Sequence, residues 1–188
     1  MAAEKRLFPD FHRMLQHQEK ALKTNILRIE MISEYLSEVS VSNRHNVVIL
    51  LCSPILLGSA ITKLREDGLE IIDCGVSLAE KCKQSEQRKF LSIELQEALQ
   101  QMLMAKAKNI IAGKPKVVGL QNLGILLEPS LGLDAMAILE KLSQNIVLLI
   151  LWEYQISPPA RLHWGVNEEQ YNLDFSNTSL TKVYSYEV

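Results

Sequence analysis

Continuous apolar runs alternate along the chain with amphipathic stretches. The runs have the length and β-branched composition of strands that are buried on both faces, and they cover 47–51, 69–74, 116–120 and 146–152. Between the runs, apolar residues recur at steps of three and four, which predicts helices over 55–66, 76–83, 87–108 and 135–142. Alternation of strands and helices predicts an α/β fold, a three-layer sandwich around a mostly parallel sheet.

The two flanks of this pattern differ from its middle. Apolar residues at helical spacing over 11–39 predict an amphipathic helix, so we interpret residues 1–45 as an N-terminal helical extension. Residues 46–175 then form the α/β domain, with a short edge strand over 161–164. Residues 176–188 form a C-terminal tail of strand-like composition. The sequence alone does not decide whether this tail is a strand, a docked end or a disordered end.

Composition bounds the class of protein. The 188 residues are 47% apolar with a formal net charge of -2, which suits one domain with a packed core and gives no general attraction for nucleic acid or anionic lipid. The three cysteines lack metal-ligand spacing, and we interpret them as reduced thiols. The start of the chain has no apolar signal core, and the longest apolar run is far below the roughly 20 residues that span a bilayer. We therefore expect a cytoplasmic protein with no membrane contact.

The turn after the first strand carries the most informative chemistry. A phosphate-binding loop uses glycines, converging backbone N–H groups and a lysine at the start of a helix. Here the same place holds Pro54, which has no N–H, a single glycine, Gly58, and no lysine. We interpret Ser53, Gly58 and Ser59 as turn and cap residues. The alternative is a degenerate nucleotide site, whose residues would be Cys52, Ser53, Pro54, Gly58 and Ser59 with Gln121 and Asn122.

The end of the third strand holds polar side chains at the edge where α/β sheets bind ligands. Gln121 and Asn122 lie there, and we expect them to satisfy the loop backbone rather than contact a ligand. Glu128 and Asp134 follow; the pair could serve acid-base chemistry, but Asp134 is explained as the N-cap of the helix at 135–142.

Other catalytic and binding chemistry finds little support. The four histidines are scattered without metal-ligand spacing, so we predict no metal site. No Gly-x-Ser-x-Gly turn is present, and we identify no nucleophile. Basic residues cluster at Lys81, Lys83, Arg88 and Lys89, and again around 106–116, but glutamates are interspersed, which favours a solvated surface over a DNA-binding face.

The order of these motifs resembles the BrxF family of small P-loop proteins in BREX-type bacterial phage-defence systems. The resemblance covers roughly 50–171, and its distinctive part is the run from Gln121 to Asn145. It implies a P-loop NTPase-like sandwich. Family members carry a Gly-Lys-Ser/Thr loop, whereas the corresponding positions of this chain, 57–60, contain no lysine. Lys63 lies about one turn into the helix, too far along to replace a lysine at the helix start. The family's acidic position at the end of the third strand falls on Gln121, and an amide cannot replace a carboxylate as a base or a strong magnesium ligand.

The residues and the resemblance together lead to one hypothesis and two rivals. We expect a catalytically inactive P-loop-like scaffold or adaptor subunit of a bacterial anti-phage defence complex, with protein partners, self-association left open and no cofactor. The first rival is an NTPase or switch that binds ATP or GTP with Mg²⁺ through an atypical loop, completed in trans by an arginine such as Arg161. The second rival is a DNA-binding accessory factor.

Overall fold

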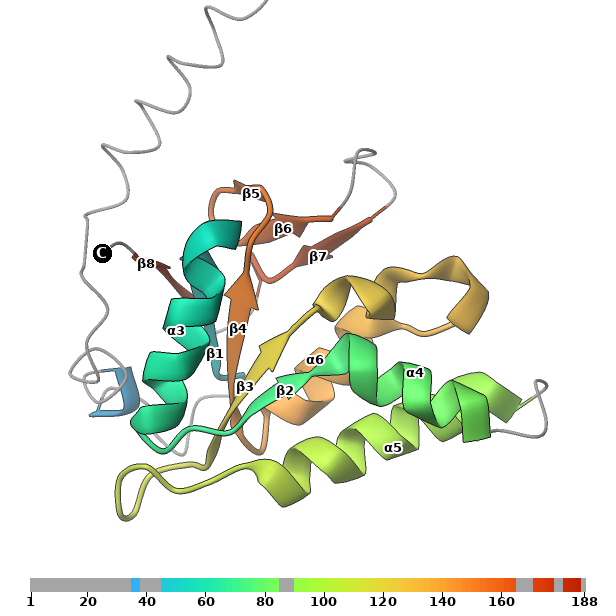
Figure 1. The fold of residues 1–188 in the computed structure, drawn as a ribbon, viewed down its shortest axis with the longest axis horizontal. Coiled ribbons are helices and arrows are strands. Elements are labelled where there is room, and N and C mark those ends of the chain that lie inside the picture. The colour runs from blue at the N-terminus through green and yellow to red at the C-terminus, as the bar shows by residue number, and fades with distance from the viewer. Residues whose placement is uncertain (1–34, 38–44, 85–89, 165–170, 178–180, 187–188) are drawn as a thin grey trace, which may run out of the picture.

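The computed structural model describes residues 35–37, 45–84, 90–164, 171–177 and 181–186 (Figure 1). Its helices are α3 (Pro54–Glu66), α4 (Cys74–Gln84), α5 (Leu91–Lys106) and α6 (Ala135–Ser143), with short 3-10 turns η2 (Leu123–Leu127) and η3 (Pro129–Leu131). Its strands are β1 (Val47–Cys52), β2 (Ile71–Asp73), β3 (Val117–Gln121), β4 (Val147–Trp152), β5 (Ile156–Ser157), β6 (Arg161–His163), β7 (Asn172–Asp174) and β8 (Thr181–Tyr186).

A five-stranded sheet in the order β2-β3-β4-β1-β8 forms the centre of the fold. All four strand pairings are parallel, and β1 and β4 align Val47 with Leu148 and Leu51 with Trp152. Parallel pairing requires crossover connections, and the helices supply them. The four runs that the sequence predicted as buried strands correspond to β1, β2, β3 and β4. β4 is buried along its whole length, whereas β2 lies at the edge of the sheet.

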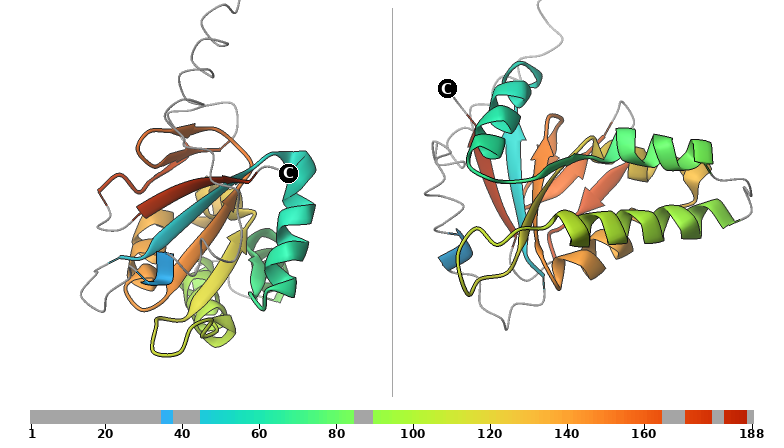
Figure 2. Two further views of the ribbon diagram at one scale, coloured as in Figure 1. Left: turned by 90° about the vertical axis from the view of Figure 1, so that its left-hand side faces the viewer. Right: turned by 60° about the horizontal axis from the view of Figure 1, so that its bottom comes forward.

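Both faces of this sheet are covered, as the alternation of side chains along β1 shows. Val47 and Ile49 pack with buried residues of α4, α5 and α6, whereas Val48 and Leu50 pack with Ala60 and Leu64 of α3. Helices therefore flank the sheet on opposite faces (Figures 1 and 2). The prediction of an α/β fold with a parallel sheet is confirmed, and the arrangement is compatible with a three-layer sandwich.

A second, antiparallel sheet in the order β5-β6-β7 lies on the α4–α6 face, where Leu162 and Leu173 join the same core. The expected edge strand over 161–164 is thus corrected: β6 is the middle strand of this small sheet. A short segment in which polar and apolar residues alternate predicts a strand but does not specify the strands beside it.

The two flanks of the chain are described only in part. Residues 181–186 form β8, which pairs with β1 at the edge of the main sheet, so the described part of the C-terminal segment is a strand. Of the expected N-terminal helical extension, residues 35–37 are described and helical, and Tyr35 and Leu36 are buried on the α3 face. The rest of the expected helix over 11–39 lies outside the described residues.

Candidate functional site

The carboxyl ends of the parallel strands meet at one edge of the main sheet. From β1 the chain passes to α3 on one face, and from the adjacent β4 it passes to the small sheet on the opposite face. Such a reversal between neighbouring strands is where doubly wound sheets open a crevice for ligands. Of the residues that the sequence singled out, Cys52 and Ser53 lie at the end of β1, and Gln121 and Asn122 lie at the end of β3.

Only Ser53 separates β1 from α3. Pro54 is the first residue of the helix, and the N–H groups of Leu56 and Leu57 both donate to the Ser53 carbonyl oxygen, at 2.9 and 3.0 Å. The Ser53 side chain makes no capping hydrogen bond. The turn thus has no loop that could wrap a phosphate, and two amides of its first helical turn are already bound.

Gly58 and Ser59, which the sequence suggested as turn and cap residues, lie instead within α3, because the helix begins at Pro54. Ile55 is 92% exposed, whereas Leu57 is half-buried and packs against the core beneath α3. A Cβ at Gly58 would meet open space, and the Ser59 hydroxyl lies 3.3 Å from that of Tyr186 on β8. Ser59 is therefore held toward β8.

Cys52 ends β1 and is buried. Burial, together with the nearby Glu153 carboxylate, raises the pKa of the Cys52 thiol to about 12. A thiol in this state is a poor nucleophile, because the nucleophilic form is the thiolate. The structure thus agrees with the interpretation of Cys52 as a reduced, buried side chain.

Gln121 and Asn122 converge on the carboxylate of Asp73 at the end of β2. Gln121 Nε2 donates to Asp73 Oδ2 at 3.0 Å, Asn122 Nδ2 donates to the same oxygen at 2.6 Å, and the Val76 N–H donates to Oδ1 at 2.9 Å. The expectation that the two amides satisfy the loop backbone is wrong, because their partner is a side chain from the neighbouring strand. Sequence reasoning missed Asp73, although an acid at the end of an apolar strand was the available signal.

Backbone conformation fits this cluster closely. Asn122 adopts a left-handed conformation with φ of 55°, which an asparagine tolerates better than most residues. A Cβ at Gly75 would lie 3.3 Å from Asp73 Oδ1 and 3.5 Å from Asn122 Cβ. Gly75 therefore lets α4 begin directly beside the carboxylate.

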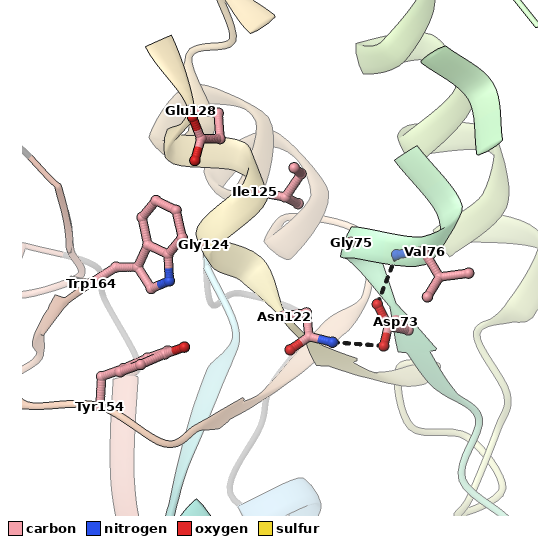
Figure 3. Close-up of a pocket in the computed structure, with 9 residues that line it drawn as sticks. All are labelled: Asp73, Gly75, Val76, Asn122, Gly124, Ile125, Glu128, Tyr154 and Trp164. Atoms are coloured by element: carbon pink, nitrogen blue, oxygen red, sulfur yellow. Dashed lines mark hydrogen bonds between the residues drawn. The ribbon is translucent and has the colours of Figure 1, made fainter. Parts of the chain in front are cut away.

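A pocket of about 350 Å³ opens beside the Asp73 cluster (Figure 3). Its walls come from the start of α4, from the segment between Asn122 and Glu128, and from the aromatic side chains of Tyr154 and Trp164. Trp164 lies over Gly124, where a Cβ would come within 2.2 Å of the indole ring. The edge of the Trp164 ring meets Tyr171, with ring centroids 5.8 Å apart.

The two acids that follow β3 have different roles. Asp134 accepts a hydrogen bond from the Ala137 N–H at 3.0 Å and caps α6, which confirms its prediction as an N-cap. Glu128 is half-buried and lines the pocket. The alternative in which Glu128 and Asp134 form an acid pair is wrong, because Asp134 is outside the pocket lining, where Asp73 is the second acid.

Arg161 lies on β6, opposite Asp174 of β7. Its Nε and one terminal nitrogen both donate to Asp174 Oδ2, at 2.9 and 2.7 Å. Hydrogen bonds from Ser176, joined by those from Arg161, lower the pKa of Asp174 to about 2. An arginine finger acting in trans would have to leave this ion pair.

One pair of residues resembles a nucleophile and its base. Ser157 Oγ lies 2.8 Å from His163 Nε2 across the β5–β6 hairpin, which the sequence did not predict. In the described part of the chain, His163 Nδ1 is buried without a hydrogen-bond partner, so no acid orients the imidazole. The pair lacks the third member of a catalytic triad.

The basic and metal-binding candidates add no site within the described residues. Lys63 contacts Asp67, Lys108 contacts Glu70 at 2.7 Å, and Lys114 donates to the Ser37 carbonyl oxygen. No group of three histidine, cysteine or acidic side chains is placed to hold a metal among these residues. Arg88 and Lys89 of the basic cluster lie outside the described residues.

No family model, curated protein or solved structure matches the chain. The helices in the described ranges include none with the length and apolarity needed to cross a membrane. The fold places the chain in the α/β class, with a parallel sheet that is flanked by helices.

Proposed function

We propose that this chain is a non-catalytic, P-loop-like scaffold or adaptor subunit of a cytoplasmic bacterial anti-phage defence complex of the BREX kind. The assignment to a defence system rests on the resemblance of the sequence to the BrxF family. The turn after β1 and the end of β3 support the absence of nucleotide chemistry.

The observation that carries the proposal is the direct passage from β1 to α3 through Ser53 alone. Phosphate loops bind by surrounding the anion with consecutive amides and a lysine. Here Pro54 lacks an N–H, the amides of Leu56 and Leu57 are bound to Ser53, and the side chain of Ile55 is 92% exposed. An incoming triphosphate would meet an apolar side chain and few free donors.

The end of β3 supports the same conclusion. Gln121 holds the place where hydrolysis requires a carboxylate, and its amide is engaged by Asp73 at 3.0 Å. Asp73 in turn accepts three hydrogen bonds, so its oxygens are occupied by protein donors. Neither residue is arranged to hold magnesium or activate water.

Partner binding is assigned to α5, which presents apolar side chains to solvent. Ile93 and Met104 are 56% and 41% exposed, and their spacing of three helical turns places them on one face. Phe90, just before the helix, is 46% exposed. Exposed large apolar side chains that share a face are typical of docking helices.

Calorimetric titration of the chain with ATP and GTP in the presence of Mg²⁺ tests the first half of the proposal. We expect no saturable heat. Saturable binding would contradict the scaffold and favour the rival nucleotide switch.

Co-purification with the other subunits of a BREX system tests the second half. We expect Ile93→Asp combined with Met104→Asp to abolish capture of a subunit, because charges would be buried at the interface. Ile55→Asp, at another exposed apolar position away from α5, is the matched control. Unchanged assembly in the double variant would contradict α5 as the docking helix.

A further inference from the structure

The residues that line the pocket beside Asp73 favour a positively charged ligand. Its lining contains two acids, Asp73 and Glu128, and no lysine, arginine or histidine. Neither acid forms an ion pair within the described ranges. A ligand that enters this pocket therefore meets negative charge that the described residues do not neutralise.

The two acids differ in what remains available to a ligand. Asp73 accepts hydrogen bonds at both oxygens, from Gln121 and Asn122 at one and from Val76 at the other. Glu128 lies at the opposite end of the pocket, and its carboxylate is directed toward the space beside Trp164 (Figure 3). Asn122 directs its carbonyl oxygen into the pocket toward Tyr154 (Figure 3). Among the acid and amide side chains that line the pocket, the Glu128 carboxylate and the Asn122 oxygen accept no hydrogen bond from the described residues, so both remain available to a ligand.

Aromatic rings complete the wall opposite Asp73. Tyr154 is 47% exposed, and Trp164 is fixed against Gly124 and by its contact with Tyr171. Aromatic rings attract cations through their π electrons. Such contacts involve guanidinium more often than ammonium, because guanidinium is planar and more weakly hydrated. A guanidinium can also donate two hydrogen bonds to one carboxylate.

We propose that this pocket binds an alkylguanidinium group, which pairs with Glu128 and packs against Trp164 and Tyr154. A volume of about 350 Å³ accommodates a guanidinium with its alkyl chain. The group can belong to a small molecule or to an arginine side chain of a partner. This inference goes beyond the proposed function and does not depend on it, because it rests on Glu128 and the two aromatic rings, which the proposed function does not use.

Indole N–H resonances provide the readout, since the chain has two tryptophans and Trp152 is 2% exposed. The probes are agmatine and the peptide acetyl-Gly-Arg-Gly-amide, and the neutral control is the same peptide with citrulline in place of arginine. We expect a saturable shift of the Trp164 resonance with a guanidinium probe, a smaller shift of Trp152, whose ring contacts Tyr154, and no saturation with citrulline. Binding of agmatine without the peptide indicates a small-molecule site, and binding of the peptide, alone or together with agmatine, shows that a partner's arginine can enter the pocket.

Matched variants separate the pocket from the rest of the surface. Glu128→Gln is expected to weaken binding about tenfold, because the charge-assisted hydrogen bonds are lost. Glu97→Gln, at an exposed position on α5, is expected to leave the affinity unchanged. Absence of saturation with both guanidinium probes, an equal response to citrulline, or unchanged affinity in Glu128→Gln would overturn the proposal.

Discussion

Asp73 and Gln121 face each other in register at the ends of β2 and β3, and the Gln121 amide donates to the Asp73 carboxylate at 3.0 Å. A carboxylate at position 121 would replace this hydrogen bond by repulsion between two negative charges. The Asp73 carboxylate therefore favours an amide over a carboxylate at position 121, independently of any function of this edge of the sheet.

Gln121→Glu is expected to lower the free energy of unfolding by about 1–3 kcal/mol near neutral pH. This repulsion requires both carboxylates to be charged, so protonation of either one in acid relieves it in the folded variant. The loss relative to the parent protein should consequently shrink as the pH falls to about 5. Urea unfolding at both pH values measures it.

Gln96→Glu, at an exposed position of α5, is the control for that measurement. It should change stability little at either pH. An equal loss in both variants, or a loss in Gln121→Glu that does not depend on pH, would contradict the contact with Asp73.

Gly124→Ala should displace Trp164. The new methyl would lie 2.2 Å from the indole ring, so we expect the free energy of unfolding to fall by about 1–3 kcal/mol and the Trp164 fluorescence to shift. Gly58→Ala is the matched substitution, because Gly58 lies inside α3 and a methyl there would have nothing within 4 Å. It should stabilise the protein by about 0.5–1 kcal/mol. Thermal unfolding compares the two, and destabilisation by both would contradict this packing.

Arg161→Gln should raise the pKa of Asp174 from about 2 only part of the way toward its ordinary value of 3.8, because the Ser176 hydrogen bonds remain. Since the folded pKa is depressed, the interaction stabilises the protein above the ordinary pKa and is lost as the pH falls through about 2. A carboxyl-detected NMR titration measures the change. An unchanged Asp174 pKa would mean that Arg161 is free of this ion pair in solution.

Thiol labelling should distinguish the three cysteines. Burial raises the pKa values of Cys52 and Cys74 to about 12, whereas Cys82 is half-buried on α4. Only one thiol of the native protein should react rapidly near pH 8 with an aromatic disulfide reagent, followed by absorbance. Cys82→Ser should remove that fast phase, and a fast phase that persists would indicate that Cys52 or Cys74 becomes exposed.

The elements that sequence alone predicts well here are those set by local pattern. The continuous apolar runs predict β1, β3 and β4 to within a residue or so, and Asp134 predicts the start of α6. The position of β6 could not be predicted, because strand neighbours depend on contacts between distant segments. For the same reason Asp73 escaped notice: its partners, Gln121 and Asn122, come from another strand, and only the fold brings them together.

The parallel pairing of β8 with β1 has a consequence for how the chain is made. The ribosome delivers β1 long before residues 181–186, so during synthesis this strand keeps an unprotected flank whose amides and carbonyls invite the wrong neighbour. The edge of β1 must therefore stay unpaired, or be covered by another segment or a chaperone, until β8 is synthesised and completes the sheet.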